Sequence, residues 1–206
     1  QSRSSAASDV YKRQILCILS MGILLPLYLK GALLFNSIIA GLILLPGNAI
    51  NLILSPIVGS LFDRFGARYF GIFGFLLMFI AALIFSLMIS VSTPVWAIIL
   101  AFMVLFFGIS MVMMPAQTNA LNQLPHHLYA DGSATITTLI QVAGSAGTAI
   151  AITIYTTAMR TFGASHPNAE QEVVLSYGIQ YACFFIVILT VIGFILSLFV
   201  KKSKNI

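Results

Sequence analysis

The segment 59-GSLFDRFGARYFGIFGFLLMFIAALIFSLMIS-90 joins a charged turn to an uninterrupted apolar block. Its charged residues, Asp63, Arg64 and Arg68, all precede Tyr69, and no charged residue follows them as far as Ser90. A run of about 20 apolar residues is what an α-helix needs to cross the hydrocarbon core of a bilayer. The block is apolar all round, whereas the helices of a soluble core would alternate faces with a period of 3.6 residues. The segment therefore predicts a transmembrane helix that follows a charged turn.

The same kind of block recurs along the chain. Six apolar blocks cover approximately residues 15–29, 36–62, 69–90, 95–116, 134–159 and 177–200. Because backbone polar groups must be satisfied inside lipid, each block is expected to be a helix. The alternating segments typical of a transmembrane β-barrel are not seen. The sequence thus predicts an all-α integral membrane protein, with a six-transmembrane-helix bundle over residues 15–200.

Composition excludes several other classes of protein. Of the 206 residues, 60% are hydrophobic and 7% are charged, whereas a soluble domain carries about 25% charged residues. The net charge of +5 does not indicate nucleic-acid binding, because the basic residues lie between the apolar blocks and form no stripe. Cys17 and Cys183 lie inside apolar blocks and are interpreted as small buried hydrophobic residues. No nucleophile–base pair, phosphate loop or metal cluster is recognised, so neither an enzyme nor a cofactor is predicted.

Both ends of the chain lie outside the bundle. Residues 1–14 (QSRSSAASDVYKRQ) are polar and Ser-rich, and they are interpreted as a non-native junction. The native N-terminus is therefore expected to be missing and the short first helix to be clipped. Residues 201–206 form a basic tail.

The distribution of Lys and Arg predicts the orientation in the membrane. With six spans, the basic residues at positions 12, 13, 64, 68, 201, 202 and 204 share one side, and only Lys30 and Arg160 lie opposite. Positively charged loops remain in the cytoplasm. Both termini and the loops at Asp63 and His126 are therefore expected in the cytoplasm of a plasma (inner) membrane protein, with loop 161–176 outside.

The segment from Gly59 to Arg68 has a spacing that an ordinary basic loop does not require. Gly59 allows two helix backbones to approach closely, and Gly66 permits a tight turn. Asp63 can pair with Arg64 or Arg68, or lie against a helix N-terminus, where a negative charge is favoured. These five residues form a candidate cytoplasmic signature loop.

This spacing resembles the signature loop between the second and third helices of the major facilitator superfamily, which reads G-x-L-x-D-R-x-G-R-R-x. The loop recurs more weakly in the second six-helix repeat of that family. Ala67 stands where the strong version often has Arg. This departure favours the second-repeat copy.

Other segments look like the second half of the fourteen-helix drug:proton antiporter group. They are 40-AGLILLPG-47, 120-ALNQLP-125, 131-DGSA-134 and 141-QVAGSAGTA-149. The resemblance runs from about Ile15 to Val200 and implies one repeat half of a transporter with alternating access. It also implies a missing N-terminal half that holds the acidic coupling residues and a glycine-rich antiporter motif.

Two amides in the second block are candidates for a substrate cavity. Pro46 and Gly47 are expected to break or bend the helix, and Asn48 and Asn51 follow on one face. Amides in hydrocarbon are costly unless they are paired or face water. They either line a central cavity or form hydrogen bonds between helices, and the sequence leaves both readings open.

The fifth block is rich in small and hydroxyl residues. Gly144, Gly147 and Thr148 predict close helix packing, and Gln141 is the best polar cavity candidate. Asp131 or Ser133 is expected to cap this helix.

Methionines and aromatic residues supply weaker candidates. Met111 and Met114 follow three phenylalanines and suit a pocket for varied apolar cations, although lipid contact or core packing explains them more simply. The pair His126-His127 is a weak metal signal. Tyr177 and Tyr181 are expected to be interfacial anchors.

The function that the resemblance implies is the C-terminal half of a proton-coupled multidrug efflux transporter. Its partners would be the missing half, a hydrophobic or cationic small molecule, protons and membrane lipid. No titratable residue lies at the centre of any block, so proton coupling is expected in the missing half. Two alternatives stay open: a transporter of a lipid, amino acid or metabolite, and a non-transporting membrane scaffold.

Overall fold

The computed structural model describes residues 19–65, 67–122, 125 and 128–199. A short apolar helix, Leu19–Gly31, comes first. It is followed by α2 (Ser37–Phe65), α3 (Ala67–Met88), α4 (Val95–Asn122), α5 (Tyr129–Ser165) and α6 (Gln171–Phe199). These five labelled helices are long and apolar enough to cross a membrane. The described part of the chain contains no strand, and the prediction of an all-α membrane bundle is confirmed.

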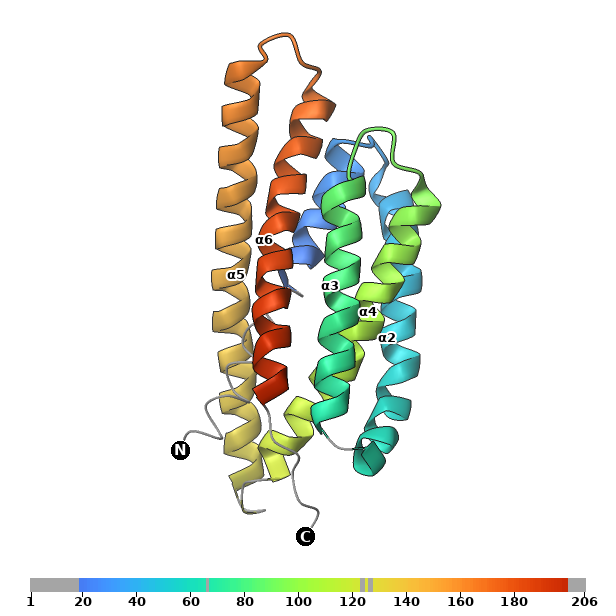
Figure 1. The fold of residues 1–206 in the computed structure, drawn as a ribbon, viewed down its shortest axis with the longest axis vertical. Coiled ribbons are helices and arrows are strands. Elements are labelled where there is room, and N and C mark those ends of the chain that lie inside the picture. Colours follow the sequence, from blue (N-terminus) through green and yellow to red (C-terminus); the bar gives the residue numbers. More distant parts are fainter. Residues whose placement is uncertain (1–18, 66, 123–124, 126–127, 200–206) are drawn as a thin grey trace.

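The helices run up and down in an antiparallel bundle (Figure 1). The connections that precede α2, join α3 to α4 and join α5 to α6 lie at one end, which we call the 165–171 end. The end of α2, the start of α3, the end of α4 and the start of α5 lie at the other end. Lys30 and Arg160 are thus near one end and the 59–68 segment near the other.

The centre of the bundle is formed by α3 and α4. Helix α3 packs against α4 and α6, α2 packs against α4, and α5 packs against α6. A Cβ atom at Gly108 would lie 2.7 Å from the carbonyl oxygen of Gly74, and one at Gly74 would lie 2.8 Å from that of Gly108. Real Cβ atoms essentially never approach so closely, so α3 and α4 meet backbone to backbone at this glycine pair.

The helix ends extend beyond several of the predicted blocks. Helix α5 begins at Tyr129 and ends at Ser165, and its 37 residues span about 55 Å, longer than the hydrocarbon core is thick. Helix α6 begins at Gln171, ahead of the predicted start at Tyr177. In Figure 1 the α5–α6 hairpin accordingly rises above the connection between α3 and α4. Hydropathy marks the part of a helix that matches lipid, and a helix continues past that part.

The predicted cap of the fifth helix is wrong. Leu128 occupies the N-cap position and makes no side-chain capping hydrogen bond. Asp131 lies inside the first turn, where its charge favours the helix dipole. The Ser133 hydroxyl donates to the carbonyl of Ala130, 2.8 Å away, instead of accepting from an amide at the helix start. The helix begins one turn earlier than hydropathy indicates, so these residues fall inside it.

Pro46 does not break α2, which is helical from Ser37 to Phe65 with both Pro46 and Pro56 inside it. Prolines are tolerated within transmembrane helices because neighbouring groups satisfy the freed backbone. Gly47 makes room for a neighbour, since a Cβ there would lie 2.3 Å from the Phe102 ring of α4. The Pro-Gly pair therefore accommodates packing between α2 and α4 within a continuous helix.

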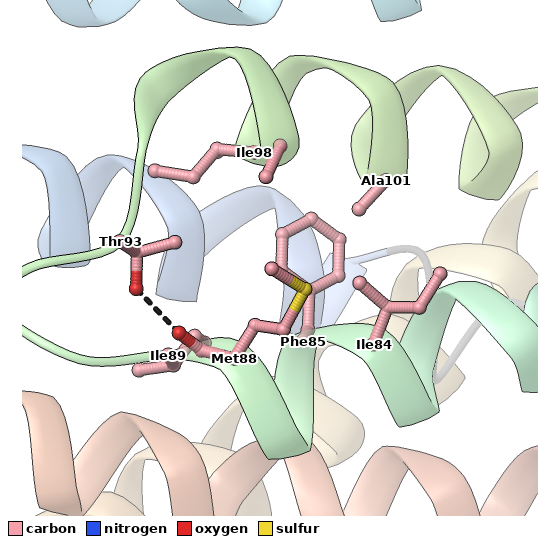
Figure 2. A pocket seen from close by; sticks show the side chains of 8 residues that line it. Ile84, Phe85, Met88, Ile89, Thr93, Ile98 and Ala101 are labelled. Atoms are coloured by element: carbon pink, nitrogen blue, oxygen red, sulfur yellow. Dashed lines mark hydrogen bonds between the residues drawn. The ribbon is translucent and has the colours of Figure 1, made fainter.

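The α3–α4 connection is held by side chains from several elements. Thr93 donates its hydroxyl to the carbonyl of Met88 (Figure 2). Tyr28 donates to the carbonyl of Ser90 at 2.6 Å, and the Gln180 amide donates to that of Ser86 at 2.8 Å. The last carbonyls of a helix lack partners within it, and Thr93 and Gln180 supply partners at the end of α3, whereas Tyr28 binds the connection that follows it. The pocket beside Thr93 has a volume of about 10 Å³. It is therefore a small gap in the packing of the fold.

Candidate transport face

Helices α2 and α5 leave most of their surface uncovered. Within an apolar stretch of 18 residues in each helix, only 17% of the residues are buried in α2 and in α5, against 44% in α3, 50% in α4 and 39% in α6. Exposed large side chains on α2 include Leu42, Leu45 and Leu52. A further structure, a substrate or lipid therefore has to cover the exposed sides of these two helices. Helices α2 and α5 do not contact each other in the described part of the chain and lie on opposite sides of the bundle in Figure 1; we call their two exposed sides together the α2–α5 face.

The α5 part of this face is rich in hydroxyl groups that are already bonded within the helix. Thr138 donates to the carbonyl of Ala134 at 2.9 Å, and Ser145 donates to that of Val142 at 3.0 Å. The same pattern holds for Thr135, Thr137, Thr153, Thr156 and Thr161. Each hydroxyl proton is thereby satisfied, and the oxygen keeps acceptor capacity for water or a ligand. These hydroxyl groups are thus hydrogen-bonded in an apolar setting and also offer a row of acceptors.

Gln141 lies on the exposed surface of α5. Ser145 and Thr148 follow it at intervals of four and three residues, so the three side chains share one side of the helix. Gly144 lies three residues after Gln141 and four before Thr148, so it adjoins this side, and it is buried together with Gly147. A Cβ at Gly144 would lie 1.7 Å from a methyl carbon of Leu19 in the first helix. The polar side of α5 thus borders its close contact with the first helix.

The two asparagines of α2 have different environments. The Asn51 side-chain oxygen accepts a hydrogen bond from the Ser110 hydroxyl of α4, 2.7 Å away, and Ser110 is buried. Asn48 is exposed, and its amide donates to the carbonyl of Leu44 in its own helix, 3.0 Å away. The geometry therefore places Asn51 in a bond between helices and leaves Asn48 on the α2–α5 face.

The Asn51–Ser110 contact gives a stability prediction. We expect Ser110→Ala to lower the unfolding free energy by about 0.6–1.7 kcal/mol, the range for hydrogen bonds between transmembrane helices. Asn48→Ala is the matched control, because its amide donates to a carbonyl of its own helix and, among the described residues, to no other helix. Reversible unfolding in mixed micelles measures both variants. Equal losses in the two variants would show that the bond between α2 and α4 contributes nothing.

Other sequence candidates lie away from this face or outside the described side chains. Met111 is half-buried and lies beside Gly74 at the contact between α3 and α4. The Met114, Asp63, Arg64 and Arg68 side chains, and residues 66 and 126–127, lie outside the described part. The backbone of the 59–68 segment is nevertheless helical on both sides of residue 66, since α2 ends at Phe65 and α3 begins at Ala67. The segment predicted as a signature loop therefore consists mostly of the end of α2 and the start of α3.

Sequence reasoning did not single out two structural features. The Gly74–Gly108 contact joins glycines from separate blocks, and a single sequence contains no signal that pairs them. The bond from Gln180 to Ser86 joins residues 94 positions apart. The signal that could have found Gln180 was an amide within an apolar block, which is costly unless it is paired. Cys183, predicted to be a small buried residue, is buried in the core.

Comparison with known proteins agrees with this architecture. The sequence profile of the Major Facilitator Superfamily matches residues 14–148. The lincomycin resistance protein LmrB of Listeria monocytogenes is 48% identical over 190 residues, which cover 91% of this chain and 40% of that protein. The protein of the same name from Bacillus subtilis is 41% identical over 194 residues, which cover 92% of this chain and 40% of that protein.

A further relative, the uncharacterized MFS-type transporter YcnB of Bacillus subtilis, is 33% identical over 182 residues, covering 88% of this chain and 38% of that protein. The chain thus spans about 40% of the length of the lincomycin resistance proteins that it matches. The family match covers well over half of the chain, and it accounts for the resemblance of the 59–68 segment. The chain is a multi-pass membrane protein that belongs to the Major Facilitator Superfamily of transporters.

Proposed function

We propose that this chain forms the second half of a proton-coupled multidrug efflux transporter of the fourteen-helix drug:proton antiporter group. The observation that carries the proposal is the exposed α2–α5 face, with Asn48 and Gln141 on it. In hydrocarbon, polar side chains of this kind tend to face a bundle interior or a water-filled cavity. The names of the lincomycin resistance relatives support a drug as the substrate.

The α2–α5 face would form one wall of an alternating-access cavity and contact the other half of the transporter. Longer relatives support the presence of that other half, because this chain matches only about 40% of their length. The centres of the apolar blocks contain no titratable residue, so the proton-carrying carboxylate would belong to the other half. The hydroxyl oxygens of α5 and the Gln141 amide would contact a hydrophobic or cationic small molecule.

The 59–68 segment would lie at the cytoplasmic face of the plasma membrane, together with both chain ends. The positive charges of this end support that orientation. The proposed role of Asp63, Arg64 and Arg68 is to hold the two halves together on the cytoplasmic side in the outward-open state. Gly59 and Gly66 would allow the close helix approach and the sharp change of direction there.

We expect that adding a drug causes protons to move across the membrane through the complete transporter. Inside-out vesicles that contain the complete transporter are energised so that the lumen is acidic, and lincomycin is added outside. We expect the lumen to become less acidic, because the drug enters in exchange for protons. Vesicles with the 206-residue chain alone should give no response, since it lacks the proton carrier. Absence of a response with the complete transporter, or coupled flux with this chain alone, would contradict the proposal.

A further inference from the structure

A pocket lies at the 165–171 end of the bundle, between the α3–α4 connection and the first turns of α6. It has a volume of about 340 Å³, within the range of about 300–1,000 Å³ that holds small ligands. Its walls are formed by residues 89–92 and, from α6, by Val173, Ser176, Tyr177 and Gln180. We call it the α3–α6 pocket. None of these residues comes from α2 or α5, so the pocket is separate from the α2–α5 face.

The side chain of Ser176 is buried at this pocket without a hydrogen-bond partner. Only 4% of the residue is exposed, and its hydroxyl has no partner within the described part of the chain. The buried hydroxyl of Ser86 instead donates to the carbonyl of Leu83 in its own helix, 2.9 Å away. An unpaired buried hydroxyl destabilises a fold. A ligand that brings a polar group to Ser176 would therefore gain a hydrogen bond without breaking one in the protein.

Other polar groups of the pocket can both donate and accept hydrogen bonds. The Gln180 amide donates to the carbonyl of Ser86, 2.8 Å away, and this bond leaves its side-chain oxygen and its second amide proton for a ligand. The hydroxyl oxygens of Ser90 and Ser92 lie 3.4 Å apart on the connection. Hydroxyl groups act as donors and as acceptors. The pocket thus suits a ligand that carries several hydroxyl groups of its own.

The ring of Tyr177 forms a flat wall that is held in place. It stacks on Phe162, with 4.2 Å between the ring centroids. Its hydroxyl donates to the hydroxyl of Tyr181, 2.9 Å away, and so keeps its oxygen as an acceptor. Val173 adds an apolar surface beside it. A sugar ring has an apolar face of C–H groups and an edge of hydroxyls, and this combination of walls matches both.

The charges around the pocket favour an uncharged ligand. No charged residue lines it. The acidic and basic residues at this end of the bundle are Lys30, Arg160, Glu170 and Glu172, two of each sign, and His166 lies at the end of α5. A phosphate or an ammonium group in the pocket would lack an adjacent counter-charge, and an unpaired charge is costly to remove from water.

The pocket lies at the level where lipid headgroups are expected. The apolar span of α3 ends at Met88 and that of α4 begins at Val95, so residues 89–92 directly follow the part of the bundle that matches hydrocarbon. Leu87 and Met88, immediately before the pocket, are 65% and 41% exposed. Acyl chains can therefore cover these side chains while the headgroup of the same lipid reaches the pocket.

We propose that the α3–α6 pocket binds the sugar headgroup of an uncharged glycolipid, with Ser176 and Gln180 hydrogen-bonded to its hydroxyl groups. The lipid is a bound partner of the protein and not its transported substrate. The site goes beyond the proposed function and does not depend on it. Lipid binding to this chain tests the site and proton flux tests the transporter, so each can fail alone.

The test uses a monoglucosyl diacylglycerol and the 206-residue chain in micelles of a polyoxyethylene detergent, which carries no sugar. Native mass spectrometry counts the lipids that each chain retains. We expect saturable retention of one glycolipid, which Ser176→Ala weakens by about three- to tenfold through the loss of one hydrogen bond. The same variant should not lower the midpoint of unfolding in lipid-free micelles, because this hydroxyl has no partner among the described residues.

Ser20→Ala is the matched control, because Ser20 is also buried without a partner in the described part of the chain and does not line the pocket. It should retain the glycolipid as the wild type does. Ser92→Leu keeps the test decisive if Ser176→Ala does not fold. Ser92 is exposed, so a leucine there can fill the pocket without entering the core, and we expect glycolipid binding to be lost.

Three results would overturn the proposal. The first is equal retention of a phosphatidylcholine with the same acyl chains, because the headgroup would then not be recognised. The second is an unchanged glycolipid affinity in Ser176→Ala or in Ser92→Leu. The third is binding of methyl β-D-glucopyranoside as tight as that of the glycolipid, because a free sugar and not a lipid would then be the occupant.

Discussion

Replacing Gly108 with leucine is expected to prevent formation of the native bundle. A Cβ at this position would lie 2.7 Å from the Gly74 carbonyl oxygen and 3.0 Å from the Met78 backbone nitrogen. Both are backbone atoms, which cannot move aside as the end of a side chain can. Overpacking a core costs about 1–3 kcal/mol where side chains can adjust. We expect a cost at or above about 3 kcal/mol here, because α3 and α4 must separate along the centre of the bundle.

Gly41→Leu is the matched control for this substitution. No atom lies within 4 Å of the Cβ position at Gly41, and the residue is exposed on α2. Leucine there should leave the unfolding midpoint unchanged or raise it slightly, since leucine favours helix more than glycine does. The folded fraction after purification and the midpoint of unfolding in mixed micelles measure both variants. Similar midpoints for Gly108→Leu and Gly41→Leu would show that the close contact between α3 and α4 is absent.

The sequence predicts the helices of this fold better than their ends. Long apolar blocks are enough to identify transmembrane helices, because bilayer thickness sets their length. The end of α5 could not be read in this way, because the residues beyond Met159, apart from Phe162, are polar or small and yet remain helical as far as Ser165. Backbone hydrogen bonds continue a helix outside lipid, and hydropathy does not report them.

The roles of the candidate site residues could likewise be predicted only in part. Asn48 and Asn51 are the same residue type in the same helix, and the sequence could not separate their roles. Their contacts separate them, because Ser110 on α4 donates a hydrogen bond to Asn51, whereas Asn48 is exposed. Gly108 likewise matters for packing because it lies against Gly74 on another helix. Such roles depend on which helices become neighbours, and one sequence does not specify those neighbours.

Gln141 should be accessible to water in the complete transporter and should contact the substrate. It is exposed on α5 beside Ser145 and Thr148, on the α2–α5 face that the account assigns to the cavity. Ile188 is also exposed, at 58%, but it lies on the apolar side of α6. A charged thiol reagent dissolves in water and is excluded from hydrocarbon. It therefore distinguishes a cavity wall from a lipid-facing surface.

The decisive measurement compares Gln141→Cys with Ile188→Cys in a complete transporter whose Cys17 and Cys183 are replaced by alanine. A trimethylammonium methanethiosulfonate reagent is added with and without lincomycin, and the rate of modification is recorded. We expect Gln141→Cys to react, lincomycin to slow its reaction several-fold, and Ile188→Cys not to react. A Gln141→Cys variant as unreactive as Ile188→Cys would contradict the claim that the α2–α5 face lines the transport cavity.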